Sequence, residues 1–293
     1  MTNTVTLLDG RKVANDIKDD LRRSVKKLIR KPRMAVILVG ENPASKTYVN
    51  AKVKACREIG IDCSLIKLPI SISESELLSE IELLNQDSKI DGYIVQLPLP
   101  KHIDQNKIIG RIDPKKDIDG FHTENIGKMT LNIPTILPAT PYGIMQLLRH
   151  YNIELEGKSC VVIGRSNIVG LPISIMMGHD DMCTVTSCHV NTQDLDVYTK
   201  MADIIIVSVG IPNFLTENMI KEDAVIVDVG INKVEDSNDP RGYKIVGDVD
   251  FDGVSSKSSY ITPVPGGVGP MTIVSLMKNL IHTTKINIDN EYS

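Results

Sequence analysis

The stretch CVVIGRSNIVGLP at residues 160–172 constrains the fold of this chain more than any other. A short apolar run enters it, Gly164 ends the run, and Gly170 closes the turn before residues 174–178, which can be helical. Glycines permit a tight turn and the amides of a helix N-terminus bind phosphate, so the stretch predicts a strand–turn–helix dinucleotide site. Ser166 stands where the G-x-G-x-x-G pattern has its middle glycine, and an ordinary strand–loop–helix corner is the alternative.

Length and composition indicate two globular domains and disfavour several kinds of partner. A chain of 293 residues is long enough for two domains. A net charge of −4, three Phe and no Trp provide neither a basic surface nor a stacking platform for nucleic acid. No apolar run approaches the roughly 18 residues that span a bilayer, and the N-terminus MTNTVTLLDG has no basic-then-apolar signal. We therefore expect no membrane association.

The cysteines and histidines predict neither a disulfide framework nor a metal site. The five cysteines are an odd number without a C-x-x-C pair, which favours a reducing cytoplasm. The six histidines have no metal-ligand spacing and no H-E-x-x-H motif, so no metal is expected.

Alternating apolar runs and helical patterns predict a parallel sheet in the first part of the chain. The run MAVILV is continuously apolar, as in a strand buried on both faces. Strand–helix–strand order implies parallel pairing with right-handed crossovers. The predicted strands are residues 34–39, 63–68 and 92–97, and the predicted helices are residues 10–29, 46–59 and 73–85.

The second part of the chain repeats this α/β design. A helix at 142–151 leads into it, and a final apolar helix at 271–284 has no neighbours in sequence, so it is expected to pack back on the first domain. The fold class predicted is α/β, with two doubly wound parallel-sheet domains, the second of Rossmann type, and a cleft between them. The predicted strands are residues 160–163, 183–187, 204–208 and 224–229. The predicted domains are residues 1–140 with 271–293, and residues 141–270.

Tyr48 and Lys52 form a second candidate site, on the helix that follows the first buried strand. Residues four apart lie on one helical face, so a phenol and an amine can address one ligand. A buried amine is suited to proton transfer when its surroundings disfavour its charged form. The alternative is a solvated helix face. Short-chain dehydrogenases also use Tyr-x-x-x-Lys, but there the glycine turn precedes the pair, whereas here it follows the pair.

The second strand of the predicted Rossmann domain favours NADP over NAD. An NAD site usually has an acidic residue near the end of this strand, whereas an NADP site has a nearby arginine. Residues 186–190 contain no acid, and Arg165 lies in the glycine turn. His189 is placed near the adenosine end of the cofactor.

Seven stretches resemble the bifunctional methylenetetrahydrofolate dehydrogenase/cyclohydrolase family, in the family's order and across nearly the whole chain. They are VGENPASKTYVNAKVKACREIGI (39–61), DGYIVQLPLP (91–100), PKKDIDGFH (114–122), GRSNIVGLP (164–172), VIVDVGIN (225–232), GDV (247–249) and TPVPGGVGPMT (262–272). The resemblance implies a folate-binding catalytic domain (1–140 and 271–293), an NADP-binding domain (141–270), an active site in the cleft and a cytoplasmic homodimer. It also implies NADP-dependent oxidation of 5,10-methylenetetrahydrofolate and hydrolysis of the methenyl product to 10-formyltetrahydrofolate.

The resemblance also implies the roles of individual residues. Lys52 is the catalytic lysine, Tyr48 lies over the folate ring system, Gln96 tunes the lysine and Asp119 holds the pterin. Asp119 could instead cap its own turn. The predicted substrate contacts further include Val95, Leu97, Pro263, Pro265, Gly266, Gly267 and Val268. The predicted cofactor contacts are Gly164, Arg165, Ser166, Val169, Gly170, His189, Val190 and Ile231.

One departure from the family pattern bears on the cofactor. Many members read C-H-S-K-T where this chain has Cys188-His189-Val190-Asn191-Thr192. Val190 lacks a hydroxyl that could contact a phosphate, so NAD use is an alternative. The same stretches would also be compatible with a protein that has only one of the two activities, or with a non-catalytic module that binds NADP or folate.

Overall fold

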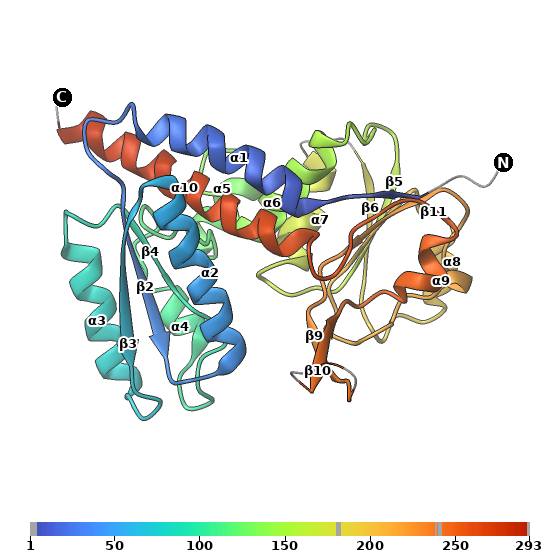
Figure 1. Ribbon diagram of the computed structural model, residues 1–293, viewed down its shortest axis with the longest axis horizontal. Helices are drawn as coiled ribbons and strands as arrows, with labels where there is room; N and C mark the ends of the chain where they lie inside the picture. The colour runs from blue at the N-terminus through green and yellow to red at the C-terminus, as the bar shows by residue number, and fades with distance from the viewer. Residues whose placement is uncertain (1–4, 180–182, 238, 240–241, 292–293) are drawn as a thin grey trace. The chain divides into compact units, whose positions relative to one another are not determined.

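The computed structural model describes residues 5–179, 183–237, 239 and 242–291, and the chain divides into two compact units (Figure 1). Unit 1 contains the residues up to Ala14 and Thr140–Thr272, and unit 2 contains Asn15–Ala139 and the residues from Ile273 onward. Each unit has its own parallel sheet, which confirms the predicted α/β class. None of the helices in the described ranges has the length and apolar character needed to cross a bilayer.

Strand β2 (Arg33–Val39) is the centre of unit 2. It pairs in parallel with β3 (Asp62–Leu68) on one side and with β4 (Gly92–Val95) on the other. After β2 the chain first adds β3 on one side and then crosses to add β4 on the other side, so the strand order reverses at β2. Ligands of open parallel sheets bind beyond the carboxyl ends of the strands at such a reversal.

Alternate residues of β2 face two separate hydrophobic cores. Met34, Val36 and Leu38 pack with residues of α2 (Pro43–Ile59), whereas Ala35, Ile37 and Val39 pack with residues of α3 (Glu74–Gln86). Figure 1 shows α2 and α3 on opposite sides of this sheet. Every residue of β2 after Arg33 is buried, which confirms the prediction of a strand covered on both faces.

The helix ends in unit 2 follow from their capping residues. Helix α2 begins three residues before the predicted start, because Asn42 Oδ1 accepts hydrogen bonds from the amides of Ala44 and Ser45. It ends at Ile59, as predicted, before Gly60 with φ of 97°. Ser73 caps α3 as predicted, in a reciprocal capping box with Glu76. After β4 the chain forms two short helices, α4 (Gln105–Ile109) and α5 (Thr123–Thr130).

The C-terminal helix α10 (Val268–Glu291) is longer than predicted at both ends. From Ile273 onward it belongs to unit 2, where Leu276, Met277, Leu280 and Ile281 join the same core as the α2 face of β2. This confirms that the helix packs back on the first domain.

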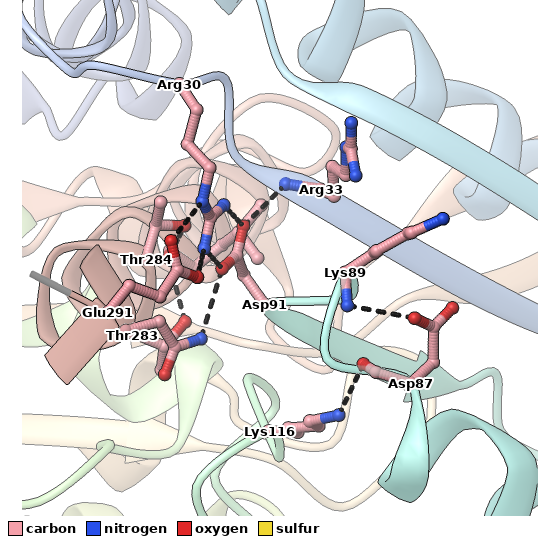
Figure 2. Close-up of polar contacts among 11 residues, drawn as sticks. Arg30, Arg33, Asp87, Lys89, Asp91, Lys116, Thr283, Thr284 and Glu291 are labelled. Atoms are coloured by element: carbon pink, nitrogen blue, oxygen red, sulfur yellow. Dashed lines mark hydrogen bonds and ion pairs between the residues drawn. The ribbon is translucent and has the colours of Figure 1, made fainter.

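A polar network at the amino ends of β2 and β4 ties the end of α10 to the sheet of unit 2 (Figure 2). The Asp91 carboxylate is 0% exposed and accepts two hydrogen bonds of 2.8 Å from the Arg30 guanidinium. It also accepts bonds from the Arg33 amide and from Asn287 Nδ2, and Arg30 reaches Glu291 at 2.9 Å. Burial alone would raise the pKa of Asp91, but these partners outweigh it and lower that pKa.

The sheet of unit 1 has six parallel-paired strands in the order β1-β11-β8-β7-β5-β6. Its central part has the Rossmann order, with β5 between β6 and β7. The strands are β1 (Thr6–Leu7), β5 (Ser159–Ile163), β6 (Thr184–Cys188), β7 (Ile204–Val207), β8 (Ala224–Asp228) and β11 (Ser258–Ile261). The helices are α6 (Ala139–His150), α7 (Gly170–His179), α8 (Leu195–Thr199), α9 (Phe251–Ser255) and a 3-10 turn at Glu217–Met219.

Three further features of the fold differ from the sequence expectation. Residues up to Ala14 lie in this unit rather than with the first domain, because Thr6 and Leu7 pair with Tyr260 and Ile261 of β11. An unpredicted antiparallel hairpin, β9 (Asn232–Glu235) with β10 (Tyr243–Val246), follows β8. The helix α1 (Gly10–Val25) is four residues shorter than predicted.

Replacing Arg30 with Met should destabilise the protein, because the Asp91 carboxylate then stays buried without its charged partner. Breaking a buried pair in this way costs about 3 kcal/mol of unfolding free energy. Arg23→Met is the matched control, because Arg23 and its partner Asp20 are both exposed, and such pairs contribute about 0–1 kcal/mol. Urea unfolding should show a clearly lower midpoint for Arg30→Met alone. Equal midpoints for the two variants would contradict the assigned importance of this network.

Candidate active site

Helix α2 carries Lys52 on its core-facing side. The buried residues of α2 recur at helical spacing and include Ser45, Val49 and Lys52. Lys52 is 7% exposed, and lysines are rarely buried without a partner. The solvated-face alternative is therefore wrong for Lys52, although Lys54 on the same helix is exposed.

Gln96 is the partner of the buried amine. Lys52 Nζ donates a hydrogen bond of 3.1 Å to Gln96 Oε1. Gln96 directly follows β4, its amide donates to the Ile37 carbonyl of β2, and its Nε2 donates to the Leu97 carbonyl at 2.7 Å. These bonds orient the side-chain oxygen of Gln96 toward Lys52. The predicted contacts Val95 and Leu97 lie at the same strand end, beside Gln96.

Tyr48 and Asp119 lie in the surroundings of Lys52. Tyr48 is half-buried one helical turn before Lys52, and burial raises the pKa of its phenol, so it stays protonated at neutral pH. Burial also raises the pKa of Asp119, while the positive charge of Lys52 acts to lower it. An amine, a carboxyl group and a phenol therefore share one region of unit 2.

Asp117, which sequence reasoning missed, holds the loop that carries Asp119. Its carboxylate accepts hydrogen bonds from the amides of Gly120 and His122 and from Asn125 Nδ2. Burial raises the pKa of Asp117 to about 6, although these bonds favour its ionised form. The carboxylate that caps this turn is therefore Asp117, which leaves the Asp119 carboxylate available to a ligand.

The glycine turn of unit 1 lies where the order of the Rossmann strands reverses. Gly164 follows β5 and has φ of 117°, and a Cβ there would lie 2.3 Å from the Ser208 carbonyl oxygen that follows β7. Only glycine allows β5 and β7 to end this close together. The predicted dinucleotide turn is thus at the crevice position expected for nucleotide ligands.

The backbone of this turn fits a phosphate group. The amides of residues 165–168 have no hydrogen-bond acceptor among the residues that the structure describes. Ser166 Oγ accepts bonds from the amides of Val169 and Gly170, so the serine caps the start of α7. A Cβ on Gly170 would lie 1.9 Å from the Gly164 oxygen. Consecutive unpaired amides in an exposed turn form an anion-binding concavity.

Arg165 lies in the turn that follows β5, near the carboxyl end of the adjacent strand β6. Ile163 pairs with Cys188, so Arg165 and Val190 each lie two residues beyond paired positions. The charge of Arg165 acts on Cys188, whose pKa is raised mainly by burial. Val190 is 45% exposed, and the His189 amide donates to Thr192 Oγ1 in the turn that follows β6. These ends of β5 and β6 fit the phosphorylated ribose of NADP.

The loop at residues 262–267 folds tightly within unit 1 and ends where α10 begins. The Gly267 amide donates to the Pro263 carbonyl at 2.8 Å, and the Arg11 amide donates to the Gly266 carbonyl. Gly266 has φ of 124°, a conformation that favours glycine. The predicted contact Pro265 belongs to this loop, and the predicted contact Val268 is the first residue of α10.

Asp228 and Asp248 form a second carboxylate pair that sequence reasoning missed. Asp228 accepts bonds from the amides of Gly230, Asp248 and Val249, and burial raises its pKa to about 6. Asp248 accepts bonds from the amides of Val209 and Gly210. The pair fixes the loops after β7 and β8, including the exposed Ile231. The sequence motifs VIVDVGIN and GDV contain both residues.

The cysteines and potential metal ligands form no disulfide bond and no metal site in the described ranges. All five cysteines are free thiols. Cys56 Sγ lies 3.5 Å from Met277 Sδ and 3.7 Å from Met34 Sδ in the core of unit 2. No group of three His, Cys, Asp or Glu side chains that could hold a metal ion occurs within those ranges.

A side chain at Gly170 should disrupt the phosphate turn. Gly170→Ala should weaken NADP binding at least tenfold, because the added methyl group collides with the Gly164 backbone and displaces the turn. Gly178→Ala in the same helix is the control, since its Cβ would meet nothing closer than 3.8 Å. Titration of each folded variant with NADP by calorimetry measures the difference. Equal affinities would show that this turn does not bind the cofactor.

Comparison with known proteins gives matches over both units. Residues 8–119 match the family model of the tetrahydrofolate dehydrogenase/cyclohydrolase catalytic domain, and residues 138–288 match that of its NAD(P)-binding domain. The bifunctional protein FolD of Flavobacterium johnsoniae is 54% identical, over 96% of this chain and 97% of its own length.

Solved structures agree with these matches. The bifunctional FolD enzyme of Campylobacter jejuni superposes with a TM-score of 0.91 and 49% identity, covering 96% of this chain and 99% of its own. The Trypanosoma brucei dehydrogenase-cyclohydrolase, solved with NADP and an inhibitor, has a TM-score of 0.93 and 35% identity, covering 97% of this chain and 98% of its own. The chain therefore belongs to the tetrahydrofolate dehydrogenase/cyclohydrolase family.

Proposed function

We propose that this protein oxidises 5,10-methylenetetrahydrofolate with NADP and hydrolyses the resulting 5,10-methenyltetrahydrofolate to 10-formyltetrahydrofolate. The observation that carries the proposal is the buried Lys52–Gln96 hydrogen bond, with Asp119 in the same electrostatic environment. A module that only bound folate or NADP would have no use for a desolvated amine held by an oriented amide. Relatives that match over nearly their whole length support both activities.

Unit 2 binds the folate. The Asp119 carboxylate can accept two hydrogen bonds from the amino-pyrimidine edge of the pterin. Tyr48 presents its ring to the folate from the same helix as Lys52 and remains a hydrogen-bond donor because its pKa is raised. Val95, Gln96 and Leu97 line the same strand end.

The oxidation step depends on positioning more than on a base. The nitrogen lone pairs of the substrate push hydride from the one-carbon bridge, and NADP supplies the hydride acceptor when bound. In unit 1 the free amides of residues 165–168 would hold the pyrophosphate of NADP, and Arg165 would pair with its ribose phosphate. The loop at residues 262–267 of the same unit would contribute further contacts to the cofactor.

The hydrolysis step requires proton transfer. Water adds to the methenyl carbon and a proton must reach the departing ring nitrogen, which Lys52 can carry from one atom to the other. Gln96 orients the amine through its side-chain oxygen, which accepts one hydrogen bond from Nζ. Both steps use one bound folate.

The family relationship further supports a homodimer in the cytoplasm.

A spectrophotometric assay tests the proposal. With methylenetetrahydrofolate and NADP, the purified protein should form NADPH, and added methenyltetrahydrofolate should lose its absorbance faster than in buffer alone. NADPH formation without hydrolysis, or the reverse, would indicate a protein with a single activity. Absence of both would contradict the enzyme assignment.

The cofactor preference can be measured in the same assay. Turnover should be faster with NADP than with NAD, because Arg165 can pair with the ribose phosphate and residues 186–190 at the end of β6 contain no acid. Val190→Ser should increase the preference for NADP several-fold, because a hydroxyl there can donate to the phosphate. Val197→Ser, an exposed valine elsewhere in unit 1, is the control. Preference for NAD in the unmodified protein would contradict the assigned phosphate site.

A further inference from the structure

Two of the five cysteines meet where α2 ends and β3 begins. The amides of Gly60 and Ile61 both donate to the Cys56 carbonyl at 2.9 Å, which ends the helix in a tight turn. The chain then enters β3 at once, and Cys63 is the second residue of that strand. The two cysteines are therefore joined by a short helix-to-strand connection within unit 2.

The side chains of Cys56 and Cys63 approach each other on the α2 face of the sheet. Cys63 pairs with Met34 of β2, and paired residues of neighbouring strands point to the same face. Cys56 Sγ lies 3.7 Å from Met34 Sδ, so it reaches this pair from α2. Cys56 and Met34 belong to one core cluster, and Cys63 packs against it. The two thiol groups interact directly, with Cys56 as the donor and Cys63 as the acceptor of a hydrogen bond.

The two thiol groups differ in exposure and in charge. Cys63 is the one partly exposed cysteine, since the other four are buried. The hydrogen bond from Cys56 and the positive charge of Arg57 lower the pKa of Cys63, against the effect of burial. The same hydrogen bond, together with burial, raises the pKa of Cys56, which therefore stays protonated. An accessible cysteine with thiolate character beside a second thiol is typical of redox sensors.

We propose that Cys63 and Cys56 are a peroxide-sensitive pair that closes a reversible disulfide bond between α2 and β3. Disulfides of cytosolic proteins are usually transient and of this kind. The Cys63 thiolate attacks hydrogen peroxide, the O–O bond breaks, and a sulfenic acid and hydroxide form. The Cys56 sulfur then attacks the Cys63 sulfur, and the displaced hydroxide takes the Cys56 proton and leaves as water. The two thiols lose two electrons, and peroxide is reduced to two molecules of water.

Cys160 and Cys183 of unit 1 provide an internal comparison. These two cysteines lie close enough to interact electrostatically, but both are buried. Burial raises the pKa of Cys160, and the Cys183 thiol donates to the Leu155 carbonyl at 3.1 Å. Neither group offers peroxide an accessible thiolate, so this pair should stay reduced under conditions that oxidise Cys63.

The disulfide would act on the candidate site through α2. A covalent S–S bond is shorter than any contact between two separate thiols, so its formation draws the last turn of α2 toward β3. β3 and β4 flank β2 on opposite sides, so this movement is away from the strand whose end carries Gln96. Lys52 lies one helical turn before Cys56 and is oriented by Gln96. Oxidation should therefore lower methenyl hydrolysis, an effect that rests on the proposed function.

Mass spectrometry of the folded, full-length protein tests the pairing. Hydrogen peroxide should lower the mass of the reduced protein by about 2 Da, and dithiothreitol should restore it. Trypsin cleaves after Lys54, Arg57 and Lys67, so the two cysteines fall in separate peptides that only a disulfide joins. Cys63→Ser should abolish the joined peptides. Cys183→Ser is the matched control and should form them in the same yield as the unmodified protein.

The two activities are then measured after the peroxide has been removed. The oxidised protein should hydrolyse methenyltetrahydrofolate about threefold to tenfold more slowly than the reduced protein, and dithiothreitol should restore the rate. Cys63→Ser should retain its rate through the same treatment, because it cannot close the disulfide. Cys183→Ser should lose and regain activity as the unmodified protein does.

Three results would overturn the inference. Oxidised protein without the joined peptides would show that the two thiols do not pair. Equal joining of Cys160 and Cys183 would show that exposure and charge do not select the reactive pair. A disulfide that leaves hydrolysis unchanged would show that the end of α2 is not coupled to Lys52. Reduced protein that hydrolyses no methenyl substrate would instead contradict the proposed function, and the peptide masses would still decide whether the thiols pair.

Discussion

The burial of β2 on both faces is the constraint on which unit 2 depends. A strand without a solvent-facing side needs apolar cover above and below, and α2 provides one of these layers. The face of α2 that packs on the strand must then be buried along its length. Lys52 lies on that face, so the packing that stabilises the sheet also desolvates the amine.

The same packing explains why the amine has one oriented partner. β4 pairs with β2 in register, and Gln96 is the first residue beyond that ladder. Its backbone amide continues the ladder by bonding to Ile37, so the side chain emerges at a defined place. In unit 1, the corresponding constraint is the close approach of β5 and β7 at Gly164, which exposes the amides of the turn that follows. In both units, the residues of the candidate sites thus lie at the carboxyl ends of parallel strands.

The fold was largely predictable from local patterns, and its exceptions are non-local. The apolar run of β2, the Ser73 cap of α3 and the glycine after α2 are properties of adjacent residues, so their elements lie within a few residues of the prediction. The pairing of Thr6 and Leu7 with β11 joins residues more than 250 positions apart, and two residues carry no periodicity that could reveal it. The length of α10 likewise depends on its packing and on the Arg30 network at its end.

The residues of the candidate site likewise divide into those that the sequence could predict and those that only the structure reveals. Lys52, Gln96 and Asp119 were expected from the resemblance, whereas the spacing of Lys52 to Tyr48 alone left a solvated helix face as the alternative. Asp117 and the Asp228–Asp248 pair escaped notice, because loop aspartates look alike in sequence and only the structure shows which amides they accept.

The role of the buried Lys52 amine is tested most directly by measuring both activities of the Lys52→Met variant. Methionine matches the length and apolar stem of lysine but cannot carry a proton, and the oxidation step needs no base. The account predicts that hydrolysis of methenyltetrahydrofolate falls to the rate in buffer while substantial NADP-dependent dehydrogenase activity remains. Hydrolysis at the unmodified rate, by a variant that folds normally, would contradict the central role of the buried amine.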